Sequence, residues 1–170
     1  INLVQRERIM DIEIKELKVT LKKYLGQYYR AKIKRKQLEI RLKNFREEMS
    51  GTQGVKYSPV PGGQSGSQIS STENAVMRAM EIEGKIVKQQ AQVQKAMLAV
   101  MEFMDFLPID SVERSVLEYR HIDCLPWKFI IARMSYSKAS CHNYYNAGID
   151  MLLGYVKVQE TLQKYIESNK

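Results

Sequence analysis

The sequence has 170 residues, and its 27 Lys and Arg against 19 Asp and Glu give a formal net charge of +8 at pH 7. A hydrophobic fraction of 44% and a charged fraction of 27% exclude a wholly disordered chain and a collagen-like fibre, while the basic balance favours a polyanionic partner. No apolar run in the sequence approaches the length of roughly 20 residues that spans a bilayer, and the sequence lacks the apolar core of a signal peptide. Its two cysteines are too few for a disulfide framework. We therefore expect a soluble, intracellular protein without a membrane partner.

The positive charge is concentrated in the N-terminal part. Residues 1–50 hold 14 basic and 7 acidic residues, whereas residues 107–150 hold 5 of each. Apolar side chains recur there at alternating spacings of three and four, and they are Ile14, Leu17, Leu21, Tyr24, Tyr28, Ala31, Leu38, Leu42, Phe45 and Met49. This heptad pattern predicts one long basic helix over residues 1–49 with a coiled-coil seam. Arg35 interrupts the seam, where its charge needs an acidic partner such as Glu83 or an open seam.

A second long helix is predicted after a linker. Residues 50–70 are rich in Gly, Pro and Ser, which favours a flexible or irregular connection. Ser70 followed by Glu73 matches a capping box, so the second helix should begin near residue 71 and continue to residue 106. Two long helices joined by a linker favour an antiparallel, coiled-coil-like hairpin. We expect the methionines near its end, Met97, Met101 and Met104, to pack in the core.

Residues 107–150 contain short amphipathic segments separated by turns of two to four residues, which is helix-turn-helix spacing. Asp110 or Ser111 can cap the first segment, Pro126 suits the first turn of the second, and Ser137 is a natural N-cap for the third. In the third segment, helical spacing places Cys141, Tyr144 and Gly148 inside. It leaves outside Lys138, Ser140, His142, Asn143, Tyr145 and Asn146. Residues 151–170 predict a C-terminal amphipathic helix that folds back on its own domain or pairs with a second copy.

The segment of residues 107–152 resembles the sigma-factor region 4-like helix-turn-helix of phage transcriptional regulators of the ArpU/RinA type. The residues at matching motif positions are Glu113, Arg114, Val116, Leu117, Arg120, Ile122, Leu125, Trp127, Ile130, Tyr136 and Ser137. Four residues depart from the motif: Cys124 and Ser135 replace glycines, Pro126 replaces Ser, and Ile131 replaces Ala. A residue other than glycine is strained where a turn needs a positive φ, and Ile131 would widen the contact between the second and third helices.

The resemblance implies an all-α fold, with the helical hairpin followed by the helix-turn-helix domain, and a sequence-specific regulator that binds double-stranded DNA. It implies a phage or prophage late-gene activator in the cytoplasm of a bacterial host, a dimer or higher oligomer, with RNA polymerase as a further partner. The helix starting at Ser137 would enter the major groove. Its base-edge candidates are Lys138, Ala139, Ser140, His142 and Asn143. The phosphate candidates are Ser137, Arg133, Lys128, Tyr145, Asn146, Lys32, Lys34 and Lys36.

Two questions stay open at this level. Because residues 107–150 are neutral, the cations of the N-terminal helix would have to supply phosphate contacts, and the alternative is that they form only the solvated face of a coiled coil. The second question is function, since an assembly or DNA-packaging protein, such as a small terminase-like subunit or a coiled-coil scaffold, could use the helix-turn-helix for packing.

Other function classes find little support in the sequence. The residues His121, Cys124, Cys141 and His142 match no common zinc spacing. A phosphate loop, a dinucleotide fingerprint and a nucleophile elbow are also absent from the sequence. We therefore predict that the protein is not an enzyme and binds no metal or cofactor.

Overall fold

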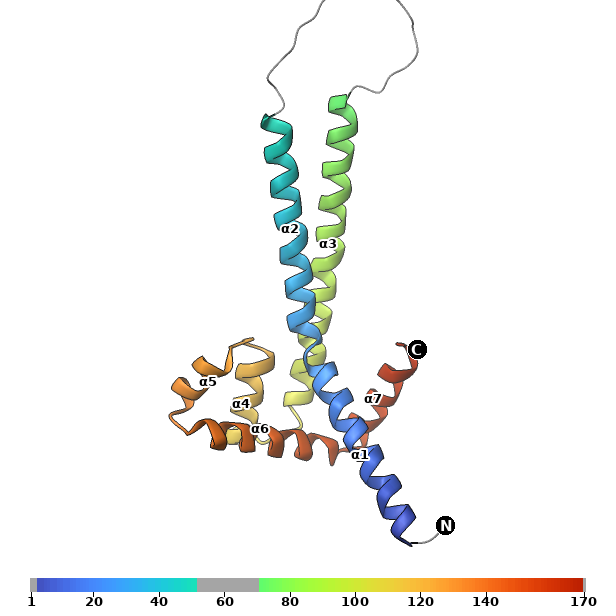
Figure 1. The fold of residues 1–170 in the computed structure, drawn as a ribbon, viewed down its shortest axis with the longest axis vertical. Helices are drawn as coiled ribbons and strands as arrows, with labels where there is room; N and C mark the ends of the chain where they lie inside the picture. The colour runs from blue at the N-terminus through green and yellow to red at the C-terminus, as the bar shows by residue number, and fades with distance from the viewer. Residues whose placement is uncertain (1–2, 52–70, 170) are drawn as a thin grey trace, which may run out of the picture. The chain divides into compact units, whose positions relative to one another are not determined.

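The computed structural model describes residues 3–51 and 71–169, and within these ranges every regular element is an α-helix (Figure 1). The all-α fold class is therefore confirmed. The helices are α1 (Leu3–Leu25), α2 (Gln27–Gly51), α3 (Ser71–Met104), α4 (Val112–His121), α5 (Trp127–Met134), α6 (Lys138–Leu153) and α7 (Val156–Glu167). Among the described residues, we find no helix with the length and apolar character needed to cross a membrane. Ser70, the predicted cap of the second helix, lies outside the described residues.

The first long helix is bent, which corrects the expectation of one continuous seam. Gly26 separates α1 from α2, although the backbone continues to bond across it, with Gly26 N donating to Lys22 O at 3.1 Å. Glycine weakens a helix locally, and the bend changes which residues face inward on its two sides. Leu25, which the seam omitted, is fully buried, whereas Ile14 is 45% exposed.

The chain divides into two compact units, of which unit 2 comprises residues 31–93. In this unit α2 and α3 lie side by side and run in opposite directions (Figure 1). Gln89 Nε2 donates to Ala31 O at 3.2 Å, and Arg46 pairs with Glu83 nearer the other end. Arg35 therefore does not meet Glu83, which was one of the alternatives that the sequence left for its charge. Arg35 Nη1 instead donates a hydrogen bond to Gln90 on α3, and its guanidinium forms an ion pair with the carboxylate of Glu39, 3.2 Å from Nε, on α2 itself.

Unit 1 comprises residues 1–30 and 94–170 and holds the main hydrophobic core. The end of α1 packs on the end of α3, where the rings of Tyr24 and Phe103 stack with centroids 4.5 Å apart. Fully or nearly fully buried side chains from six helices and one loop complete this core: Leu21, Leu25, Val100, Met104, Leu107, Val116, Leu117, Ile130, Ile149, Leu152, Val158 and Leu162. Met101, expected in the core, is instead 39% exposed.

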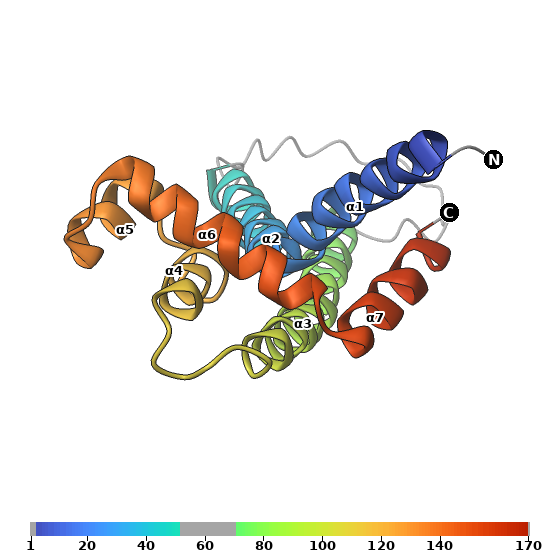
Figure 2. The same ribbon diagram turned by 90° about the horizontal axis from the view of Figure 1, so that it is seen from below.

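The C-terminal helix folds back within unit 1. The chain breaks from helix at Gly154 and Tyr155, and α7 then packs against α1 (Figure 2). Tyr165 meets the edge of Tyr24 at a centroid distance of 5.2 Å, and Val158 and Leu162 are fully buried. Of the two expectations for this apolar stripe, folding back on its own domain is the one observed.

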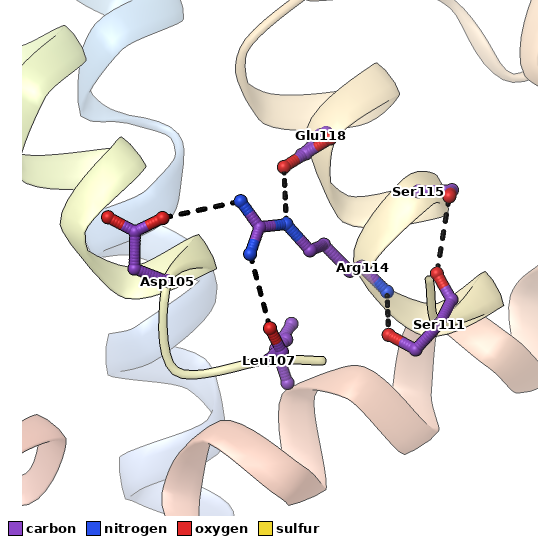
Figure 3. A network of polar contacts seen from close by, with 6 residues as sticks. All are labelled: Asp105, Leu107, Ser111, Arg114, Ser115 and Glu118. Carbon is purple, nitrogen blue, oxygen red and sulfur yellow. Dashed lines mark hydrogen bonds and ion pairs between the residues drawn. The ribbon is translucent and has the colours of Figure 1, made fainter. Parts of the chain in front are cut away.

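A polar network around Arg114 joins the end of α3 to α4 (Figure 3). The guanidinium donates to the Glu118 carboxylate at 2.7 Å, to Leu107 O at 3.2 Å and to Asp105 at 3.3 Å. Its side chain is only 16% exposed. The hydrogen bond to Glu118 raises the pKa of Arg114. Two of these contacts, to Asp105 and Leu107, therefore join α4 to the end of α3, and the third, to Glu118, lies within α4.

We expect Arg114→Met to lower the free energy of unfolding by about 2 kcal/mol, because it leaves the carbonyl of Leu107 and the carboxylate of Glu118 without their charged donor. The control is Arg133→Met, whose guanidinium is 57% exposed and 3.9 Å from Asp123, and it should cost about 1 kcal/mol or less. Urea titration followed by circular dichroism measures both. Equal reductions in the two variants would show that the Arg114 network contributes no more than a surface ion pair.

Candidate nucleic-acid interface

The helices α4, α5 and α6 are bounded by local signals that the sequence contains. Ser111 is the N-cap of α4 and accepts a hydrogen bond from Arg114 N, and Ser137 is the N-cap of α6 and accepts one from Ser140 N at 3.1 Å. Pro126 precedes α5 with an extended backbone, at the N-cap position, one residue earlier than predicted. The predicted serine caps are confirmed, with Ser111 rather than Asp110 capping α4.

Both turns in this region use a left-handed backbone at residues other than glycine. Cys124, between α4 and α5, and Ser135, between α5 and α6, each have a φ of 56°. These are the two positions where the sigma-factor-like motif carries glycine. A side chain in this conformation costs about 1 kcal/mol or more relative to glycine, so the strain expected from the sequence is present at both turns.

A close contact between α4 and α6 sets the orientation of α6. A Cβ atom added to Gly148 would lie 2.7 Å from Leu117 Cδ1 and 3.2 Å from Glu113 Cβ. The absence of a side chain at Gly148 therefore allows α6 to approach α4 this closely. Cys141, Gly148 and Ile149 are buried on this face of α6, which confirms the inward position predicted for Cys141 and Gly148.

An aromatic cluster lies where α4, α5 and α6 meet. The ring of Trp127 lies against that of His142 with centroids 4.0 Å apart and planes tilted by 35°, and it meets the edge of Tyr145 at 5.4 Å. The guanidinium of Arg120 lies 5.6 Å from the Trp127 ring centre, and its Nη1 donates to Leu125 O at 3.1 Å. The contact between Trp127 and His142 was not predicted from the sequence, because the two residues lie on different helices and no local spacing relates them.

The position of Tyr145 corrects a prediction. We expected an outward side chain that contacts phosphate, but Tyr145 is only 9% exposed, and its hydroxyl lies 3.1 Å from His121 Nε2. Burial raises the pKa of Tyr145. The prediction failed because Tyr145 follows Cys141 by one helical turn and so shares its buried face. Tyr145 belongs to the core of this unit and is unavailable to a phosphate.

The other base-edge candidates lie on or near the exposed part of α6. Lys138, Ala139 and Asn143 are exposed, whereas Ser140 and His142 are partly buried. Ser140 Oγ lies 2.9 Å from Ser137 Oγ, and the His142 ring rests on Trp127. The first turns of α6 therefore present a cation, a methyl group and an amide to solvent, with one imidazole held at the edge.

The phosphate candidates are spread over several elements. Lys128 and Ser137 are exposed, and Arg133 lies 5.2 Å from the Tyr119 ring centre. Asn146 Oδ1 accepts a hydrogen bond from Lys22 Nζ at 3.3 Å. In unit 2, Lys34 and Lys36 are exposed and Lys32 is partly buried. Unit 1 thus contains Lys128, Ser137, Arg133 and Asn146 together with the α6 candidates, while the three lysines belong to unit 2.

Two lysines of α1 contact α6, and neither was among the predicted site residues. Lys18 Nζ lies 2.7 Å from the Asp150 carboxylate, and Lys22 bonds Asn146. The Lys18 contact neutralises the acidic residue in the C-terminal part of α6. The basic character of residues 1–50 was the available signal, although it does not indicate which lysines meet α6.

The residues considered for zinc have other roles. Cys141 is buried, and His121 bonds Tyr145. In the part of the chain that the structure describes, no group of three or more His, Cys, Asp or Glu side chains is arranged to hold a metal ion.

Comparison of the chain with protein-family models, curated proteins and solved structures finds no significant match.

The buried imidazole of His121 makes the stability of unit 1 depend on pH. Burial and the nearby charge of Arg120 lower its pKa from 6.5 to about 4. The unfolded chain therefore binds a proton more readily than the folded chain. The stabilising contribution is complete above pH 6.5 and disappears as the pH falls toward 4, with a total of about 3 kcal/mol.

We expect His121→Gln, which does not titrate, to flatten this part of the dependence. Urea denaturation at intervals from pH 7 to pH 4 should show a smaller decrease of unfolding free energy in this variant than in the wild type. His142→Gln is the matched control, since it keeps His121 and therefore keeps the dependence. Parallel pH profiles for wild type and His121→Gln would contradict the assignment.

Proposed function

We propose that this protein is a sequence-specific transcriptional regulator that binds double-stranded DNA and reads the major groove with α6. The observation that carries the proposal is the exposure of Lys138, Ala139 and Asn143 on the first turns of a capped helix. The face of that helix opposite Ala139 and Asn143 is buried against α4. In a helix-turn-helix protein, the N-terminal residues of the second helix of the motif contact base edges.

The side chains at the start of α6 fit groove chemistry. Lys138 can donate to guanine O6 and N7, Asn143 can pair with adenine N6 and N7, and the methyl group of Ala139 suits a thymine methyl. Lys128, near the start of α5, and the capped N-terminus of α6 suit phosphate oxygens. The helix-turn-helix resemblance of residues 107–152 supports the same orientation.

The charge distribution supports contributions from outside the reading helix. Residues 107–150 are neutral, whereas residues 31–93 carry 11 basic and 6 acidic residues. Phosphate contacts supply most of the sequence-independent affinity for DNA. We therefore include Lys32, Lys34 and Lys36 of α2 as phosphate contacts of the complex.

The wider biological role rests on the resemblance alone. It suggests a phage or prophage late-gene activator in the bacterial cytoplasm that needs no cofactor and contacts RNA polymerase as an oligomer. The alternative is an assembly or DNA-packaging protein, and the long helical pair of unit 2 is the observation that favours it. A defined operator sequence would distinguish a regulator from such a protein.

Selection of bound fragments from a random duplex pool tests the proposal. The wild type should yield a defined motif, and Lys138→Ala and Asn143→Ala should each relax one position and weaken binding roughly 5- to 150-fold, since a good bidentate base contact is worth about 1–3 kcal/mol. His142→Ala tests the partly buried candidate in the same way. Lys164→Ala on α7 is the charge-matched control and should recover the wild-type motif. Failure to recover any motif, or an unchanged motif in every variant, would reject α6 as the reading helix.

Salt dependence tests the lysines of unit 2. We expect Lys32→Gln, Lys34→Gln and Lys36→Gln, combined, to weaken binding to all duplexes alike. The slope of log K against log salt concentration should become less steep by about 0.9 for each phosphate that these lysines neutralise in the wild type. Fluorescence anisotropy across a salt series measures the slope, with Lys164→Gln as control. An unaltered slope would leave these lysines as a solvated face of the helix.

A further inference from the structure

Helix α3 has a second apolar face that no element of the described chain covers. Its first face packs within the two units and includes the buried residues Gln89, Val93, Ala96 and Val100. On the opposite face, residues recur at spacings of three and four without a break. They are Met77, Met80, Gly84, Val87, Ala91, Gln94, Leu98 and Met101, all of them exposed, and we call them the outer seam.

The composition of the outer seam is unusual for a surface that faces only water. Met77, Met80, Val87 and Leu98 are between 61% and 71% exposed, and none of the eight positions carries a charge. The exposed side of α2 is mixed, since it carries Lys34, Lys36 and Arg41 beside the exposed Ile33 and Ile40. Apolar residues sustained at heptad a and d positions are the pattern of a coiled-coil interface, and solvated helix faces are normally polar.

We propose that the outer seam binds the outer seam of a second copy of this chain, in parallel and in register. In a parallel pair each residue meets its own equivalent, so Gln94 would face Gln94 of the second copy and the two amides could bond each other. In a fully overlapping antiparallel pair a positions meet d positions, and Gln94 would lie opposite Gly84, which has no side chain to bond its amide. Gly84 and Ala91 allow the backbones to approach closely, and the methionines fill the remaining gaps.

The charges beside the outer seam favour the same orientation. Counting Met77 as position a, Glu81, Lys88, Lys95 and Glu102 occupy e positions, and Glu83 occupies a g position. A parallel pair brings g against the following e, which sets Glu83 beside Lys88 of the second copy, so that its carboxylate would lie between Lys88 and the Arg46 that it already pairs with in its own chain. A fully overlapping antiparallel pair brings e against e, which would set Glu81 beside Glu102 and Lys88 beside Lys95. Like charges in such positions are destabilising.

This association depends on α3 alone and holds whether or not the protein binds DNA. The outer seam and the buried face lie on opposite sides of α3. A substitution on the outer seam therefore leaves the contacts of the buried face in place. The arrangement is isologous, since the same surface contributes from each copy. The proposal can therefore be tested on the whole 170-residue chain in the absence of nucleic acid.

Light scattering coupled to size-exclusion chromatography measures the mass. The wild type should give twice the chain mass of 19.8 kDa. Val87→Glu places like charges opposite each other and should halve that mass, with the circular dichroism spectrum unchanged. Gln92→Glu adds the same charge on the same helix away from the outer seam and should leave the mass doubled. A wild-type mass of 19.8 kDa at every concentration, or an unaffected Val87→Glu dimer, would overturn the proposal.

Disulfide cross-linking tests the orientation. In a Cys124→Ser background, Gln94→Cys should form a covalent dimer under mild oxidation, because the equivalent residues of a parallel pair lie within disulfide reach. Gln92→Cys, off the outer seam, should cross-link far less. A doubled mass without cross-linking through residue 94 would overturn the parallel register.

Discussion

The close contact between α4 and α6 determines which side chains of unit 1 are presented to a partner. Gly148 lets α6 approach Leu117 on α4, and this approach buries Cys141, Tyr145 and Ile149 on one face of α6. Ala139 and Asn143 lie on the opposite face of the helix and are exposed as a consequence, whereas Lys138, three residues before Cys141, is exposed as the first residue of α6. A larger residue at Gly148 would move or rotate α6 and change that exposed set. The candidate reading surface therefore depends on a packing constraint that lies on the other side of the helix.

Helix α1 shows that a basic helix can serve a structural role as well as an electrostatic one. Its apolar residues Leu21 and Leu25 lie in the core of unit 1, while Lys18 and Lys22 contact Asp150 and Asn146 on α6. Because Lys18 and Lys22 already pair with side chains of α6, they are less available to the phosphates of a nucleic acid. Net charge alone therefore overstates the number of cations that a nucleic acid could meet, and the exposed lysines of α2 become the clearer candidates.

Local features of the fold could be predicted and contacts between helices could not. Serine caps and helix-turn-helix spacing depend on neighbouring residues, so Ser111 and Ser137 were assigned correctly. The bend at Gly26 escaped prediction because a single glycine is tolerated in most helical patterns. The burial of Tyr145 follows from its position one turn after Cys141, so the spacing within α6 contained that signal. The contact of Trp127 with His142 depends on how α5 and α6 pack, about which the spacing within one helix carries no information.

Two features of the chain, the neutrality of residues 107–150 and the uncharged outer seam on α3, have a common consequence for the proposed binding to DNA. A neutral reading unit gains little affinity from phosphates, so a single copy would discriminate among sequences while binding all of them weakly. Joining two copies makes the second binding event intramolecular, which raises overall affinity without any new contact to DNA. Specificity would then come from α6 and affinity from association through α3 together with the cations of α2. Disrupting the outer seam should accordingly weaken binding to a paired site far more than binding to a half-site, while the bases preferred by α6 stay the same.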